Sequence, residues 1–229
     1  RITTHYYEND VLSSLYSVVH EGGHALYELH LDDALIGSSL AHGTSMGVHE
    51  SQSRFFENMI GRSQAFCHVL YPKLKELFPQ QMADVSEEEL YRAANLAQPS
   101  LIRTEADELT YSLHIMVRYE LEKRIFADEL TVDQLPAEWN RLYREYLGIE
   151  VPDDAHGILQ DSHWSGGDFG YFPSYSIGSA YAAQIYAAMC RELDVPVLVQ
   201  RGELAPVVDW LTQRIYRYGS QIDPPQVLL

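Results

Sequence analysis

Basic residues are scarce in this chain. Its 229 residues include 16 Lys and Arg against 33 Asp and Glu, which gives a formal net charge of −17. This negative charge argues against nucleic acid or an anionic membrane surface as a partner. Long apolar runs are also missing, and nothing approaches the roughly 18 consecutive apolar residues of a membrane span. We therefore predict a soluble protein that associates with neither.

Cysteine is rare as well. Only Cys67 and Cys190 occur, far apart and outside any metal-ligand spacing. Such cysteines are typical of buried thiols in a reducing compartment, with a disulfide as the alternative. No signal peptide is visible, although a chain that starts inside a longer protein would hide one. We expect a cytoplasmic protein, and the 46% of hydrophobic residues is ample for a core.

Apolar residues recur at helical spacing along most of the chain. Between Val11 and Leu29 their period is close to 3.6, and Asn9 or Asp10 can cap this helix. Further helices are predicted over residues 47–60, 86–97, 105–126, 136–147, 176–193 and 204–218. A strand is conceivable only around residues 101–104, and no long linker divides the chain. We predict one mainly α domain over residues 1–229, with at most a small β element near the active site.

The segment His20-Glu21-Gly22-Gly23-His24 lies within the first predicted helix. Two imidazoles four residues apart share one helix face and can hold one divalent metal ion. Glu21 is then placed to take a proton from a water molecule on the metal, as in zinc-dependent peptide hydrolases. Each mid-helix glycine costs roughly 1 kcal/mol relative to Ala. Close approach of another backbone or of substrate would explain Gly22 and Gly23.

Glu50 is the candidate for a third metal ligand. A catalytic zinc usually has three protein ligands and one open position. Glu50 opens the second predicted helix, after a Gly/Ser-rich connection over residues 37–47. The alternative is a first-turn carboxylate favoured by the helix dipole. Beside the first motif we favour ligation. Zn²⁺ is the default for such a site, although Co²⁺ or Mn²⁺ can occupy one.

The chain resembles the carboxypeptidase Taq family of metallocarboxypeptidases. The family's zinc motif corresponds to residues 20–24 and its His-Glu-Ser/Gly-Gln motif to 49–52. Its Ile-Arg-x-x-Ala-Asp motif corresponds to 102–107, and its Gly-x-x-Gln-Asp-x-His-Trp motif to 157–164. The resemblance implies a multi-helix, zincin-like domain that removes C-terminal residues from peptides, and a homodimer.

Two family motifs are incomplete or absent. The Asp-x-Arg-x-Thr motif is present only from Arg1 onward, and the upstream His-Pro-Phe motif is missing. Family members are about twice this long, so we expect the chain to be the C-terminal portion of a longer protein. Two alternatives stay open. One is a non-catalytic metal-binding fragment that needs the N-terminal half, and the other is a zinc endo-oligopeptidase or dipeptidyl carboxypeptidase.

The polar loop after residue 157 should supply donors for the oxyanion of the reaction. His163 and Tyr171 are the candidates, and Tyr175 is the rival of Tyr171. Related helical zinc peptidases, of the angiotensin-converting enzyme and thimet oligopeptidase kind, place a His and a Tyr late in the chain for this purpose. Gln160 and Asp161 are expected to shape the loop.

A carboxypeptidase must also bind the free carboxylate of its substrate, which favours the fork of an arginine. Arg103 is the leading candidate. The nearby Glu105, Asp107 and Glu108 could either orient it or hydrogen-bond to the zinc-binding histidines. The alternative for Arg103 is a structural ion pair. Arg1 is the second candidate for this role.

Overall fold

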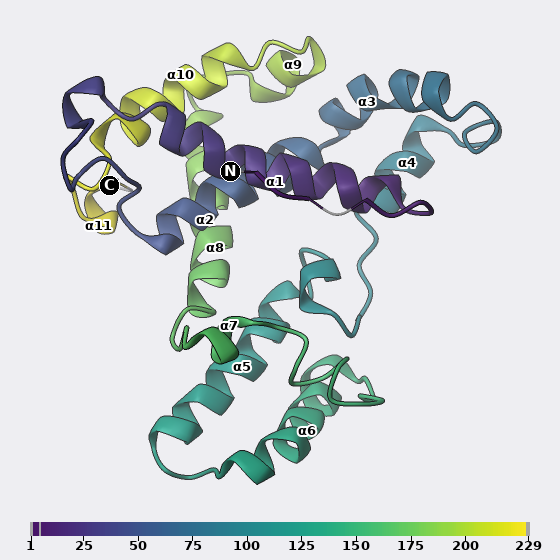
Figure 1. Ribbon diagram of the computed structural model, residues 1–229. Coiled ribbons are helices and arrows are strands. Elements are labelled where there is room, and N and C mark those ends of the chain that lie inside the picture. The colour runs from purple at the N-terminus through teal and green to yellow at the C-terminus, as the bar shows by residue number, and fades with distance from the viewer. Residues whose placement is uncertain (1, 5, 228–229) are drawn as a thin grey trace. The chain divides into compact units, whose positions relative to one another are not determined.

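The computed structural model describes residues 2–4 and 6–227 (Figure 1). Within these ranges the chain forms helices and no sheet; one isolated antiparallel bridge joins Tyr7 and Asp10. The predicted mainly α class is confirmed. The prediction of a possible strand around residues 101–104 is wrong, because Arg103–Glu105 forms a 3₁₀ turn. No helix of the described residues is long and apolar enough to cross a membrane.

The chain divides into two compact units. The first unit comprises residues 1–95 and 177–229, and the second comprises residues 96–176. The single catalytic domain expected over residues 1–229 stays a prediction. The helices, in chain order, are α1 (Val11–Leu29), α2 (Met46–Arg54), α3 (Gln64–Leu77), α4 (Glu87–Ala94), α5 (Tyr111–Phe126), α6 (Leu135–Leu147), α7 (His163–Gly166), α8 (Pro173–Met189), α9 (Val195–Gln200), α10 (Ala205–Arg214) and α11 (Pro224–Val227).

In the first unit α1 packs against α2 and against the segment that follows α2 (Figure 1). Asp10 caps α1 by accepting a hydrogen bond from Ser13 N, and Ser45 caps α2 by accepting one from Val48 N. These caps satisfy backbone donors at the helix starts. The main core lies beneath these helices and joins them to residues of α8, α9 and α10. Its fully buried members include Tyr27, Val48, Phe55, Ala182, Met189, Val207, Leu211 and Tyr216.

The segment Phe55–Gly61 is a π-helix that continues α2. The sequence predicts one ordinary helix here, and the wider turn is a departure from that expectation. Such π segments occur mostly within α-helices and are frequent at functional sites. This one carries Glu57, whose carboxylate lies 2.9 Å from Nδ1 of His20 on α1.

In the second unit α5 packs against α6 around a core that includes Leu121, Trp139 and Tyr143. The helix expected to begin at Glu105 begins instead at Tyr111. Asp107 accepts hydrogen bonds from the backbone of Leu109 and Thr110, which holds a turn before the helix. Short polar side chains compete with helix formation in this way.

The two cysteines differ in environment. Both are free thiols, and Cys67 is buried whereas Cys190 is exposed. The expectation of two buried thiols is therefore wrong for Cys190, which lies just after the end of α8.

Candidate active site

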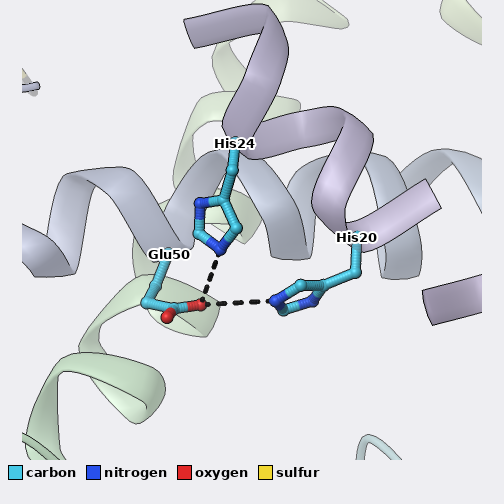
Figure 2. Close-up of side chains that lie close together, drawn as sticks. All are labelled: His20, His24 and Glu50. Atoms are coloured by element: carbon cyan, nitrogen blue, oxygen red, sulfur yellow. Dashed lines mark ion pairs between the residues drawn. The ribbon is translucent and has the colours of Figure 1, made fainter. Parts of the chain in front are cut away.

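Helices α1 and α2 bring His20, His24 and Glu50 together (Figure 2). One potential ligand atom from each lies within 4.8 Å of the others. Oε2 of Glu50 is 3.7 Å from Nε2 of His20 and 3.6 Å from Nε2 of His24. Ligands at zinc-bond length from one tetrahedral ion stand roughly 3.4 Å apart. The three side chains therefore fit a single metal ion of this kind.

Glu57 sets the orientation of His20. Its Oε2 lies 2.9 Å from Nδ1 of His20 and 3.2 Å from Nη1 of Arg54. Burial raises the pKa of Glu57, but Arg54, the hydrogen bond from His20 and Arg62 outweigh this effect and lower the pKa to about 2. A carboxylate only accepts hydrogen bonds, so Nδ1 of His20 carries the proton. Its other ring nitrogen, Nε2, lies on the side of Glu50.

His24 is held as a neutral imidazole. Burial, followed by the nearby His20 and His49, lowers the pKa of His24 to about 3. Neutral imidazole is the form that ligates metals. Nδ1 of His24 lies 2.6 Å from Nδ1 of His49, and its Nε2 is turned toward Glu50 (Figure 2).

The segment Glu50-Ser51-Gln52-Ser53 is buried, and each of its four side chains makes a hydrogen bond. Ser53 Oγ donates to Oε2 of Glu50 at 3.0 Å. Gln52 accepts a bond from the Tyr216 hydroxyl at 3.0 Å and donates to Ser51 Oγ at 2.8 Å. Partners of this kind fix a carboxylate in one orientation, which a metal ligand requires.

Close backbone packing explains one glycine of the zinc motif. A Cβ on Gly23 would lie 2.4 Å from the carbonyl oxygen of Gln52 and 2.7 Å from Cα of Ser53. The expected approach of another backbone is thus confirmed at Gly23. At Gly22 a Cβ would meet nothing within 4 Å, so no neighbouring backbone explains that glycine.

Gly178 of α8 is a site residue that the sequence reasoning missed. A Cβ there would lie 2.6 Å from Cβ of Glu50, so α8 rests directly on the third candidate ligand. A sequence signal for this contact was the run of three small residues Gly178-Ser179-Ala180 within the predicted helix. Small residues on a helix permit such close contact.

In the second unit Asp161 joins two buried arginines. Its Oδ1 accepts from Arg103 Nε at 3.0 Å and Nη2 at 2.7 Å, and its Oδ2 accepts from Arg118 Nε at 2.6 Å. Burial raises the pKa of Asp161, but Arg118 and Arg103 together hold it below its usual value. Gln160 Oε1 accepts from the Arg103 backbone at 2.8 Å and from Arg118 Nη2 at 2.9 Å. Gln160 and Asp161 thus shape the loop as expected.

This network bears on the role of Arg103. Its guanidinium is engaged by Asp161 and by the Tyr111 hydroxyl, and the residue is 5% exposed. The partner is Asp161, whereas Asp107 accepts hydrogen bonds from the chain around Thr110. These contacts favour a structural ion pair for Arg103 over a guanidinium that is free to bind a substrate carboxylate. Binding of a substrate carboxylate by Arg103 stays a prediction, and Arg1 lies outside the described residues.

His163 is surrounded by aromatic rings. Its Nε2 lies 3.1 Å from the Tyr175 hydroxyl, and its ring centroid is 5.3 Å from that of Tyr171 and 4.4 Å from that of Phe172. Burial, followed by the charge of Arg103, lowers the pKa of His163. The structure therefore brings His163 together with both tyrosine candidates. Tyr175 makes a direct hydrogen bond to His163.

Glu122 of α5 holds the loop that carries these residues, and the sequence reasoning missed it. The side chain is buried and accepts from Trp164 Nε1 at 2.7 Å and from Gly170 N at 3.0 Å. Trp164 lies within α7, and Gly170 lies in the loop that follows it. No sequence signal separates Glu122 from Glu120, which pairs with Lys123 at the surface of the same helix.

The predicted residues are divided between the two units. His20, Glu21, His24 and Glu50 lie in the first unit, with Glu21 half-buried on α1 beside its neighbour His20. Arg103, His163, Tyr171 and Tyr175 lie in the second unit. The first group is the one that provides a candidate metal centre.

A helical fold with two histidines on one helix and a glutamate on the next defines a metallopeptidase of the His-Glu-x-x-His class. The chain belongs to the carboxypeptidase Taq (M32) family of metallopeptidases, which it matches over residues 1–229. It is 49% identical over 229 residues to carboxypeptidase 1 of Bacillus subtilis, and 45% identical over 225 residues to thermostable carboxypeptidase 1 of Thermus thermophilus. These matches cover 100% and 98% of this chain.

Solved structures of carboxypeptidases have the same fold as this chain. The chain superposes with a TM-score of 0.95 on a carboxypeptidase of Pyrococcus furiosus, at 42% identity and over 99% of this chain and 46% of that one. An M32 carboxypeptidase of Deinococcus radiodurans gives a TM-score of 0.94 at 43% identity, again over 99% of this chain and 46% of that one. The chain spans 46% of the Bacillus relative and 44% of the Thermus relative. It is thus about half the length of the curated relatives it matches.

Proposed function

We propose that this chain carries the metal centre of a metallocarboxypeptidase that hydrolyses C-terminal residues from peptides. The observation that carries the proposal is the group His20, His24 and Glu50, with Glu50 Oε2 3.6 to 3.7 Å from both imidazoles. Two imidazoles and one carboxylate suit Zn²⁺, and Co²⁺ or Mn²⁺ can bind similar donors. When bound, such an ion polarises the scissile carbonyl and makes water a stronger acid.

The proposed work of the protein is to hold the ligands and move a proton. Glu21 follows the first ligand on α1 and is the proposed base, taking a proton from the attacking water and giving it to the leaving amine. His163 and Tyr171 are proposed donors to the oxyanion, with Tyr175 as the alternative to Tyr171. Arg103 and Arg1 stay the candidates for the substrate's terminal carboxylate.

One alternative is supported by the length of the chain. Because it covers 46% of the Bacillus relative, the remainder of such a protein can be required for turnover. In that case the 229-residue chain binds metal and cleaves nothing alone. An endo-oligopeptidase or dipeptidyl carboxypeptidase is the further alternative within the enzyme class.

Cleavage of one short peptide in two forms tests the proposal. The chain is incubated with Zn²⁺ and the peptide carrying either a free or an amidated C-terminus, and products are followed by mass spectrometry. We expect release of single C-terminal residues from the free acid only. Equal cleavage of the amide would indicate an endopeptidase, and bound zinc without cleavage of either form would support the metal-binding fragment.

Two further features of the proposal concern its setting. The free thiols of Cys67 and Cys190 support a reducing compartment such as the cytoplasm. A homodimer is proposed from the family resemblance, and light scattering of the purified chain measures it.

A further inference from the structure

His49 and Glu28 form a hydrogen-bonded line that ends at His24. Nε2 of His49 lies 2.8 Å from Oε1 of Glu28, and Nδ1 of His49 lies 2.6 Å from Nδ1 of His24. We propose that Glu28 is a positioning residue that acts through His49 to present Nε2 of His24 to a metal ion. This inference rests on the metal centre in the proposed function.

The positions of the protons follow from what each group can do. A carboxylate only accepts, so the proton between Glu28 and His49 sits on Nε2 of His49. A neutral His49 then has a lone pair on Nδ1, which accepts a hydrogen bond from Nδ1–H of His24. This leaves the lone pair of His24 on Nε2, the atom 3.6 Å from Oε2 of Glu50. Glu28 thus selects the ligating tautomer of His24 from two hydrogen bonds away.

Packing holds His49 in the orientation that this line requires. Its ring centroid is 5.3 Å from that of Tyr27. A Cβ on Gly43 would lie 2.8 Å from Cδ2 of His49 and 2.9 Å from Cε1 of Tyr27. The backbone at Gly43, in the loop before α2, therefore packs directly against both rings. Gly43 N also donates to Oε1 of Glu28 at 3.1 Å. Glu28 therefore ties the loop to α1 while it accepts from His49.

The two candidate imidazole ligands are held by different means. His20 meets Glu57 directly, and the side chain of Glu57 is 12% exposed. His24 is reached through His49, and the side chain of Glu28 is 41% exposed. Partners of metal-binding histidines typically contribute about 10- to 100-fold in metal affinity. When an exposed carboxylate is removed, water can take over part of its hydrogen bonding. We therefore expect Glu28 to contribute about 10-fold in metal affinity, the lower end of this range.

Zinc affinity of the 229-residue chain tests the proposal without using peptide cleavage. The dissociation constant is measured by competition with a chromophoric chelator for the wild type, Glu28→Ala and Glu28→Gln. Glu28→Ala should weaken binding about tenfold. Glu28→Gln keeps an oxygen acceptor for His49 and should weaken it less. Glu76→Ala, on the exposed surface of α3 in the same unit, is the matched control and should leave affinity unchanged.

A second measurement reads the tautomer directly. Imidazole nitrogen chemical shifts in the metal-free chain should show His24 protonated at Nδ1 in the wild type and a mixture of tautomers in Glu28→Ala. Unchanged zinc affinity together with an unchanged tautomer in Glu28→Ala would overturn the proposal, as would a wild type that binds no zinc. Zinc binding by a wild type that cleaves no peptide would contradict the proposed carboxypeptidase activity and leave this positioning role supported.

Discussion

The adjacent glycines Gly22 and Gly23 should respond in opposite ways to the same substitution. A Cβ at Gly22 would enter open space, whereas one at Gly23 would lie within 2.4 to 2.8 Å of the backbone of Gln52 and Ser53. Both positions are inside α1, so both gain the same helix propensity on replacement by Ala. The pair therefore isolates the contact between α1 and α2.

The magnitudes follow from these contacts. Gly22→Ala should stabilise the fold by about 1 kcal/mol, because Ala favours a helix interior over Gly by that amount. Gly23→Ala receives the same gain, but overpacking typically costs about 1 to 3 kcal/mol. The obstructing atoms are backbone rather than the ends of flexible side chains, so the cost falls at or above the upper value. We expect Gly23→Ala to be destabilising by about 2 kcal/mol net.

Thermal unfolding followed by circular dichroism measures both effects, with chelator present so that bound metal does not contribute. For a chain of this size, about 1 kcal/mol corresponds to roughly 2 to 4 °C in Tm. Gly22→Ala should raise Tm and Gly23→Ala should lower it. A Tm for Gly23→Ala equal to or above that of Gly22→Ala would refute the close contact of α1 with α2.

Three other perturbations have defined outcomes. Gly178→Ala places a Cβ 2.6 Å from Cβ of Glu50 and should weaken zinc binding at least about tenfold, measured by chelator competition. Glu122→Gln points an amide NH₂ group at one of the two N–H groups that now donate to the carboxylate, and should cost about 1 to 3 kcal/mol of stability. This cost should appear as a lower urea midpoint in the tryptophan fluorescence. Burial and then Arg118 lower the pKa of His114 to about 4. Between pH 6.5 and about pH 4 the imidazole of His114 is protonated in the unfolded state but not in the folded state. Lowering the pH through this window should therefore reduce the free energy of unfolding by roughly 3 kcal/mol. His114→Gln should flatten this pH dependence. Retained zinc affinity, an unchanged midpoint or an unchanged slope would contradict the respective prediction.

Local sequence patterns predicted many of the helices and the shared face of His20 and His24, because both depend on short-range spacing, whereas α3 (Gln64–Leu77) was not predicted. His20 and His24 share a face on any helix, and Ser86 and Glu89, three residues apart, form a capping box at the start of α4. Helix boundaries were less accurate. The helix α5 begins at Tyr111 because the Asp107 side chain accepts hydrogen bonds that hold a turn before it. The spacing of apolar residues carries no information about such hydrogen bonds.

Long-range partners could not be predicted in the same way. Glu57 meets His20 because a π-helical segment turns it toward α1, and nothing in residues 55–61 separates that segment from an ordinary helix. Asp161 was expected to shape its loop, but its pairing with Arg103 joins residues 58 apart in sequence. Glu28, on α1, contacts His49 only because α1 and α2 pack side by side. These contacts depend on tertiary packing rather than on local spacing.

Replacement of Glu21 by Gln separates metal binding from catalysis. The substitution removes the proposed base and none of the proposed ligands. We predict that Glu21→Gln retains about one zinc per chain and cleaves a free-acid peptide about 10²- to 10⁴-fold more slowly than the wild type. His24→Ala, assayed in parallel, should lose the metal. Undiminished cleavage by Glu21→Gln, or undiminished zinc in His24→Ala, would contradict the proposed metallocarboxypeptidase site.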